Sequence, residues 1–130
     1  EYYTLFVDPF SDHGVDTAAS CHIDGHPYGQ TLVEFRDFLK QADIGKFKDN
    51  TENEDSLVIM LDVMVTLIEE HEKRGKNTTA LQEILLQKFL LPMTTLFSAR
   101  LHENPVARFY GGCADLLTAY LDLEKGLFVQ

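Results

Sequence analysis

Basic residues are scarce in this sequence. Its 130 residues include 11 Lys and Arg against 21 Asp and Glu, which gives a formal net charge of −10. Proteins that bind nucleic acid neutralise phosphates with clustered Lys and Arg, and no such cluster is present. Docking on an anionic membrane surface is disfavoured for the same reason. The imbalance is greatest in the first 35 residues, which contain no Lys or Arg and six acids: Glu1, Asp8, Asp12, Asp16, Asp24 and Glu34.

Cysteine and long apolar runs are also scarce. Cys21 and Cys113 belong to no Cys-x-x-Cys pattern, so we interpret them as free thiols of a cytosolic protein, with a disulfide left open. The longest apolar run, Leu57 to Leu61, is too short to span a membrane, and no signal peptide is recognised. The chain lacks an initial Met and opens inside an apolar pattern. We therefore expect a single domain over residues 1–130 that is the C-terminal greater part of a longer chain.

Period-two alternation of apolar and polar residues is absent over any convincing length, so no strand is predicted. Helical spacing instead predicts an all-α fold. We expect a bundle of about five helices around a central apolar helix at residues 55–73, with a long N-terminal loop over 9–30. Residues 1–8 are expected to be the end of a helix. Further helices are expected near 31–42, 79–91, 93–102 and from 105 onward.

The starts of three helices are predicted from capping residues. Two segments fit the capping box, in which the side chains at both ends bond to free backbone N–H groups. They are Thr51-x-x-Glu54 and Thr79-x-x-Gln82. An Asn followed by Pro is a good N-cap and first helical residue, and it predicts that the last helix starts at Asn104-Pro105.

Glycine and proline predict the remaining boundaries. Gly45 suits the position just after the helix at 31–42. Pro92 is expected to kink or divide its helix, because its ring clashes with the preceding turn. Gly111 and Gly112 lower the helix propensity of the last helix by about 1–2 kcal/mol. Close approach of a neighbouring helix would explain them.

The acidic loop also holds residues that could bind a metal: His13, His22, His26 and Cys21, beside Asp8, Asp12, Asp16 and Asp24. Their spacing matches no zinc pattern, so a solvated polar loop is the favoured interpretation. Cys21 and His22 are adjacent, but a catalytic pair needs a spatial geometry and an orienting third group. The nucleophile-elbow, phosphate-loop and dinucleotide-binding motifs are missing. We therefore predict no catalytic, metal or cofactor site.

Several segments resemble, in order and spacing, the TorD/DmsD/NarJ family of redox-enzyme maturation chaperones. That family's pattern is roughly E-Y-x-x-L-F, a loop, Y-G-E-S-T-L-x-x-x-R-x-F, and E-P-x-D-H opening a helix. The matching segments here are Glu1 to Val7, Tyr28 to Phe38, Glu52 to Leu57, Leu91-Pro92 and Phe109-Tyr110. The chain departs from the pattern at Gln30, Asn53 and Ser56, which stand for Glu, Pro and His.

The resemblance implies a cytoplasmic, non-enzymatic chaperone of anaerobic respiration. Such proteins bind the N-terminal leader of a molybdenum-containing oxidoreductase subunit, often a twin-arginine signal, and hold it back from export until the cofactor is inserted. A leader with two Arg and an apolar stretch needs an acidic rim beside an apolar groove. The residues predicted to bind this peptide are Glu52, Asp55, Ser56, Tyr28 and Asp24.

Helix capping is an equally supported role for the acids at Glu52 and Asp55, and it is compatible with peptide binding. We expect Arg36 to pair with a nearby acid. Two other functions are kept as alternatives, namely an assembly module for a folded oxidoreductase subunit and a metal-dependent enzyme that uses the His/Asp loop. A dimer formed by helix exchange is a further expectation, because a helical fragment exposes apolar surface.

Overall fold

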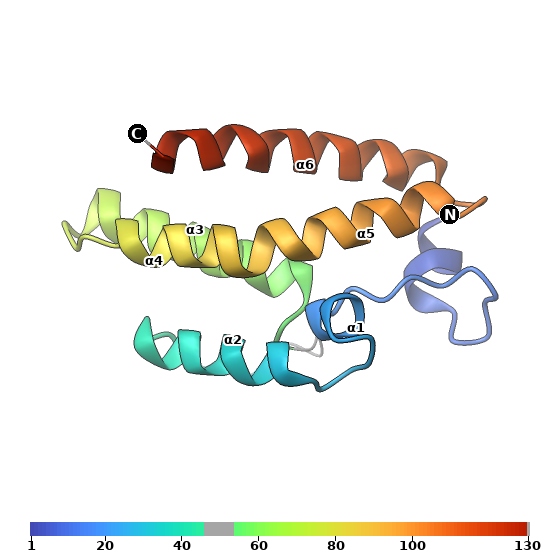
Figure 1. Cartoon of the computed structure of the whole chain (residues 1–130), viewed down its shortest axis with the longest axis horizontal. Coiled ribbons are helices and arrows are strands. Elements are labelled where there is room, and N and C mark those ends of the chain that lie inside the picture. Colours follow the sequence, from blue (N-terminus) through green and yellow to red (C-terminus); the bar gives the residue numbers. More distant parts are fainter. Residues whose placement is uncertain (46–53, 130) are drawn as a thin grey trace.

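The chain folds into layers of helices. The computed structural model describes residues 1–45 and 54–129, and within these ranges it contains six α-helices, two π-helical segments and no strand, which confirms the all-α class. Figure 1 shows α6 above a middle layer of α3, α4 and α5, with α1 and α2 below. In chain order the elements are η1 (Tyr3–Val7), α1 (Ala19–Ile23), α2 (Gln30–Gln41), α3 (Leu57–Lys73), α4 (Thr79–Ile84), η2 (Leu85–Leu90), α5 (Leu91–Glu103) and α6 (Arg108–Val129).

The core lies between α2, α3 and the η2–α5 segment. Phe89 of η2 packs against two rings of α2, with centroids 5.2 Å from Phe35 and 5.6 Å from Phe38. α3 contributes one buried face: Ile59, Met60, Val63 and Leu67. Its opposite side leaves Val58 and Val65 exposed. α3 is thus a core helix packed on one side, whereas its sequence predicted packing all round.

The segment predicted as a loop over 9–30 differs from the expectation, because it contains the short helix α1. The end of α2 also differs. Asp43, with φ of 57°, takes the left-handed position predicted for Gly45. The N–H of Ile44 then donates to the carbonyl of Leu39 over 2.9 Å, which closes the helix in a Schellman arrangement.

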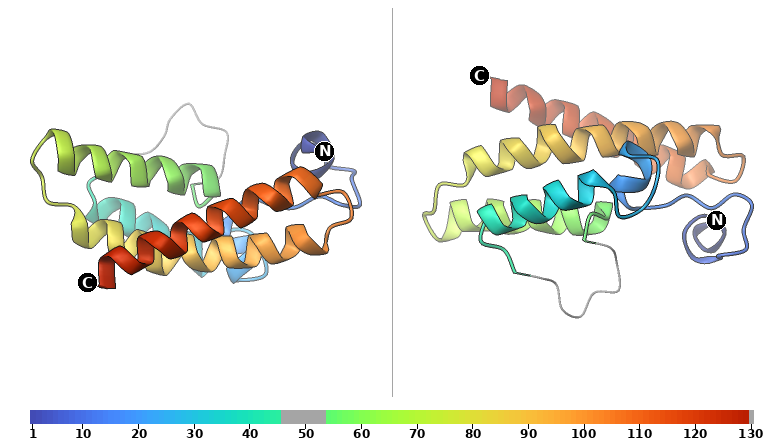
Figure 2. Two further views of the ribbon diagram at one scale, coloured as in Figure 1. Left: turned by 90° about the horizontal axis from the view of Figure 1, so that it is seen from above. Right: turned by 60° about the horizontal axis from the view of Figure 1, so that its bottom comes forward.

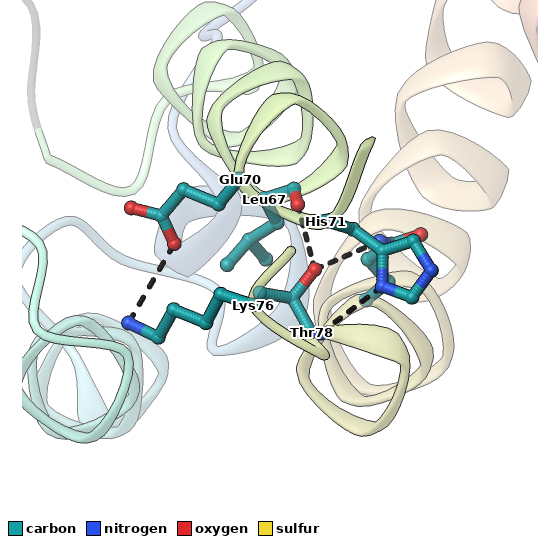
Figure 3. A network of polar contacts seen from close by, with 6 residues as sticks. Leu67, Glu70, His71, Lys76 and Thr78 are labelled. Atoms are coloured by element: carbon teal, nitrogen blue, oxygen red, sulfur yellow. Dashed lines mark hydrogen bonds and ion pairs between the residues drawn. The ribbon is translucent and has the colours of Figure 1, made fainter. Parts of the chain in front are cut away.

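A buried threonine ties α3 to α4 (Figure 3). The Thr78 hydroxyl donates to the carbonyl of Leu67 over 2.6 Å, and the Thr78 N–H donates to Nδ1 of His71 over 3.4 Å. Nearby, Lys76 Nζ lies 3.7 Å from a carboxylate oxygen of Glu70. The capping box predicted at Thr79 is wrong. α4 begins at Thr79 with Thr78 as its N-cap residue, and Gln82 reaches the Thr78 hydroxyl over 3.0 Å.

Pro92 divides its helix, as predicted. The turns that precede it form the π-helix η2, and Pro92 is the second residue of α5. Because proline has no N–H and its ring crowds the preceding turn, a regular α-helical ladder cannot run through this point. The last helix starts later than predicted, at Arg108. Asn104 is the C-cap residue of α5, and its side-chain oxygen accepts from the Val106 N–H over 3.0 Å.

Candidate peptide-binding site

Asp55 and Ser56 hold the start of α3 against the start of α1. Ala18 and Ser56 form an isolated antiparallel bridge, in which the N–H of Ala19 donates to the backbone carbonyl of Asp55 over 2.8 Å. The Asp55 carboxylate accepts from the Ser20 N–H, also over 2.8 Å. The Ser56 hydroxyl accepts from the Ile59 N–H over 3.2 Å and is the N-cap of α3. Asp55 is 1% exposed and Ser56 is fully buried, so capping is the role that their contacts show.

The predicted capping box at Thr51 and Glu54 is therefore wrong as the start of α3, which begins at Leu57 with Ser56 as its cap. Thr51 and Glu52 lie outside the described residues. Glu54 has another contact, because its carboxylate lies 3.3 Å from Nε of Arg36. The predicted pairing of Arg36 with an acid is confirmed.

Asp24 performs the same capping function for α2. Its carboxylate accepts from the Thr31 N–H over 2.8 Å and from the Thr31 hydroxyl over 3.0 Å. Tyr28 precedes the helix with φ of 57° and is 70% exposed. The Tyr-Gly-Gln-Thr segment thus forms a turn that brings the end of α1 against the first turn of α2.

Gly29 allows the Asp24 carboxylate to approach. A Cβ atom at Gly29 would lie 2.5 Å from Oδ2 of Asp24 and 2.8 Å from its Cβ, which is too close for any side chain.

We expect Gly29→Ala to displace Asp24 from Thr31 and to lower the free energy of unfolding by about 1–2 kcal/mol. Urea unfolding followed by circular dichroism measures this. Gly45→Ala is the control, because a Cβ there meets nothing within 4 Å. Equal effects of the two substitutions would count against this account.

The Cys21–His22 pair does not form a nucleophile and base. Both ring nitrogens of His22 have other partners. Nε2 donates to the carbonyl of Asp16 over 2.6 Å, and Nδ1 accepts from Arg100 over 2.8 Å. Burial, followed by the positive charge of Arg100, lowers the pKa of His22, and this favours the neutral ring that these two bonds need. Residues 1–45 and 54–129 contain no group of three or more His, Cys, Asp or Glu that could hold a metal.

The two cysteines are free thiols in different environments. Burial, assisted by the negative charge of Asp16, raises the pKa of Cys21 to about 11. At pH 8 its reactive thiolate is therefore present on the order of one part in a thousand. Cys113 is exposed on α6.

We expect iodoacetamide at pH 8 and low protein concentration to label Cys113 at least about tenfold faster than Cys21. Peptide mass spectrometry measures both rates, and comparable rates would contradict the assigned environments.

An apolar groove of about 300 Å³ opens where η1, α3, α5 and α6 meet. Figure 2 shows α6 running across α5, with the start of α3 to one side of it. The described residues that line the groove include no charged side chain. They are Tyr2, Phe6, Thr17, Leu57, Val58, Phe97, Leu101, Tyr110, Cys113, Ala114 and Leu117.

Aromatic rings build one end of this groove. The Phe6 ring packs edge-on against Tyr110 at a centroid distance of 5.1 Å and lies 6.2 Å from the Phe97 ring. The Glu1 carboxylate accepts from the N–H groups of Phe109, over 3.2 Å, and Tyr110, over 2.9 Å. These bonds, the one from Tyr110 first, lower the pKa of Glu1. η1 is thereby fastened to the first turn of α6.

The predicted site residues and the groove are only partly adjacent. Thr17 and Leu57 both line the groove, and the N–H of Leu57 donates to the carbonyl of Thr17 over 2.9 Å. Asp55 and Ser56 directly precede Leu57, so their capping contacts hold this border of the groove in place. Asp24 and Tyr28 lie at the α1–α2 turn, in the lower layer of Figure 1. The sequence led us to expect an apolar groove but not the residues that line it, although three of its rings, Tyr2, Phe6 and Tyr110, stand in segments that match the family pattern.

Comparison with known proteins identifies the family of this helical bundle. The model of the nitrate reductase delta subunit family matches residues 1–99, so the chain belongs to that family. It is a family of redox-enzyme maturation chaperones, which confirms the resemblance found in the sequence. The search of curated proteins and the search of solved structures gave no match. Among the described helices, none is long and apolar enough to cross a membrane.

Proposed function

We propose that this protein is a cytoplasmic chaperone that binds the N-terminal leader of a molybdenum-containing oxidoreductase subunit. It would assist folding, cofactor insertion and export proofreading of that subunit, and it has no catalytic step of its own. The observation that carries the proposal is the uncharged, aromatic-walled groove on a chain of net charge −10. A peptide with an apolar stretch and an Arg pair complements both properties.

The groove would take the apolar part of the leader. Val58 lines it from α3, Phe97 from α5 and Tyr110 from α6. Burying leader side chains among these groups gains the free energy of removing apolar surface from water. Because no charged side chain among the described residues lines the groove, binding of an apolar segment buries no unpaired charge there.

The acidic surface would take the Arg pair. Asp62 is exposed on α3, one turn after Val58 of the groove wall. The proposal also includes Glu52, Asp24 and Tyr28 as outer contacts of the leader. Asp55 and Ser56 act by positioning the groove border. The excess of acids attracts a cationic peptide over a longer range and raises its association rate, and salt weakens both effects.

Titration with leader peptides tests the proposal. We expect saturable binding of a fluorescent twin-arginine leader to the 130-residue chain, weakened by salt and by replacing both Arg with Gln. If no molybdoenzyme leader from the same genome binds, the proposal is wrong. If a client subunit lacking its leader is captured as well as the intact subunit, the chain is instead an assembly module for the folded subunit.

A further inference from the structure

The outward side of α6 carries a continuous apolar stripe. Its residues are spaced four and three apart in alternation, the seam pattern of a helix that pairs with another helix. They are Phe109, Cys113, Leu116, Tyr120, Leu123 and Leu127, all exposed, with Leu116 at 74% and Leu123 at 69%. A separate row, Ala114 and Leu121, is buried in the core, and Ala107 just before the helix continues it. α6 therefore has two apolar faces, and its own chain covers one.

Small residues run beside this exposed stripe at intervals of seven: Gly112, Ala119 and Gly126. A Cβ at Gly111, Gly112 or Gly126 would meet nothing within 4 Å, so the close approach of a helix expected at Gly111-Gly112 does not occur within the chain. Glycine inside a helix is unfavourable relative to alanine. An approaching helix from outside the chain would explain small residues in a row beside the stripe.

We propose that α6 pairs with α6 of a second copy in antiparallel orientation. The spacing of the stripe is symmetric about position 118. Turning the second helix end for end about this point therefore places Phe109 opposite Leu127 and Cys113 opposite Leu123. Leu116 then meets Tyr120 of the second copy. The axis of this operation crosses the helix at position 118. Gly112 therefore lies two residues, about 3 Å, from the level of Gly126 of the second copy, and Ala119 lies the same distance from the level of its own equivalent. Apart from Leu123, which meets Cys113, every large side chain of the stripe thus meets a large one, and the small residues let the two backbones approach.

Charge favours a second copy over a cationic leader as the occupant. Between Phe109 and Leu127, the stripe and its row of small residues contain no charged side chain. Of the acids that flank this face, Asp115 bonds His102 and Glu124 bonds Tyr120 within the same chain, which reduces what the face offers to an Arg pair. The stripe extends over about 27 Å at the rise of an α-helix. α6 also lies beyond residues 1–99, which match the family model. The stripe shares Cys113 with the groove proposed for the leader, so the two sites are neighbours, but pairing of α6 does not require leader binding.

Light scattering after size-exclusion chromatography tests the pairing. We expect the mass to rise with concentration toward twice the 14.8 kDa of one chain. Leu116→Glu combined with Leu123→Glu should restore the single-chain mass, with helicity checked by circular dichroism. Val33→Glu, at a 47% exposed position on α2, should leave the dimer intact. A single-chain mass at all concentrations, or a dimer that persists in the double variant, would overturn the proposal.

Two further variants distinguish this geometry from non-specific association. Ala119→Leu enlarges the apolar surface, so it would strengthen non-specific association, whereas it should weaken a pair that brings Ala119 close to the axis. For direction, Cys113→Ser with Ala119→Cys should form an intermolecular disulfide on mild oxidation, because position 119 lies one residue from the two-fold axis. If the natural chain instead cross-links efficiently through Cys113, the helices are parallel and the proposed arrangement is wrong.

Discussion

Replacing Val58 by lysine is expected to weaken leader binding by about tenfold or more, equivalent to about 1.4 kcal/mol. Val58 lines the groove from α3 and is 51% exposed, so the new side chain can be accommodated without unfolding the protein. Its ammonium group would stand at the site of apolar contact and would repel the Arg pair of the leader. Fluorescence anisotropy with a labelled leader measures the loss.

Val33→Lys is the matched control for this prediction. Val33 is also a half-exposed valine, on α2, and is not among the residues that line the groove. Its replacement changes the net charge of the protein by the same amount. A general loss of electrostatic attraction would affect both variants alike, whereas a groove-bound leader predicts a large effect at Val58 only. Equal effects at the two positions would contradict the assignment of the leader to the groove.

Asp55→Ala is expected to lower the free energy of unfolding by about 3 kcal/mol. The substitution removes the carboxylate that accepts from the Ser20 N–H and leaves that buried donor without a partner. Loss of an exposed helix cap costs about 1–2 kcal/mol, and the cost is higher here because a buried donor left without a partner costs up to about 3 kcal/mol. Urea unfolding measures the change.

Two variants control for this effect. Asp55→Asn keeps an oxygen that can accept from Ser20 and should cost less than Asp55→Ala. Asp62→Ala removes an exposed acid from α3 and should change stability by less than about 0.5 kcal/mol. If Asp55→Ala and Asp62→Ala are equally mild, the carboxylate of Asp55 does not hold α1 and α3 together.

The long helices were predictable because their apolar residues repeat at helical spacing. Leu32, Phe35 and Phe38 give this signal for α2, and the structure begins that helix within one residue of the prediction. α1 was missed because five residues offer no period to detect. It is capped by Asp55, 35 positions from Ser20, and a contact at that separation leaves no local pattern.

The candidate site was predicted unevenly for a similar reason. Acids at the starts of helices are recognisable locally, and a capping role was predicted for Asp55, which caps α1 and not α3. Asp24 was predicted only as a contact of the peptide, and its capping of α2 was missed. Whether such an acid caps its own helix or another one depends on packing. The lining of the groove could not be predicted, since it comes from positions as distant as Tyr2, Val58 and Leu117, and the folded chain brings them together.

Photo-cross-linking of a leader peptide tests the central claim most directly. The peptide carries a photoreactive group in its apolar stretch, and tandem mass spectrometry locates the attachment sites on the protein. We predict attachment at groove residues such as Val58, Tyr110 and Leu117, suppressed by excess unlabelled leader. Attachment confined to α2 or to the Asp12–His26 segment, or labelling that excess leader does not suppress, would contradict the account.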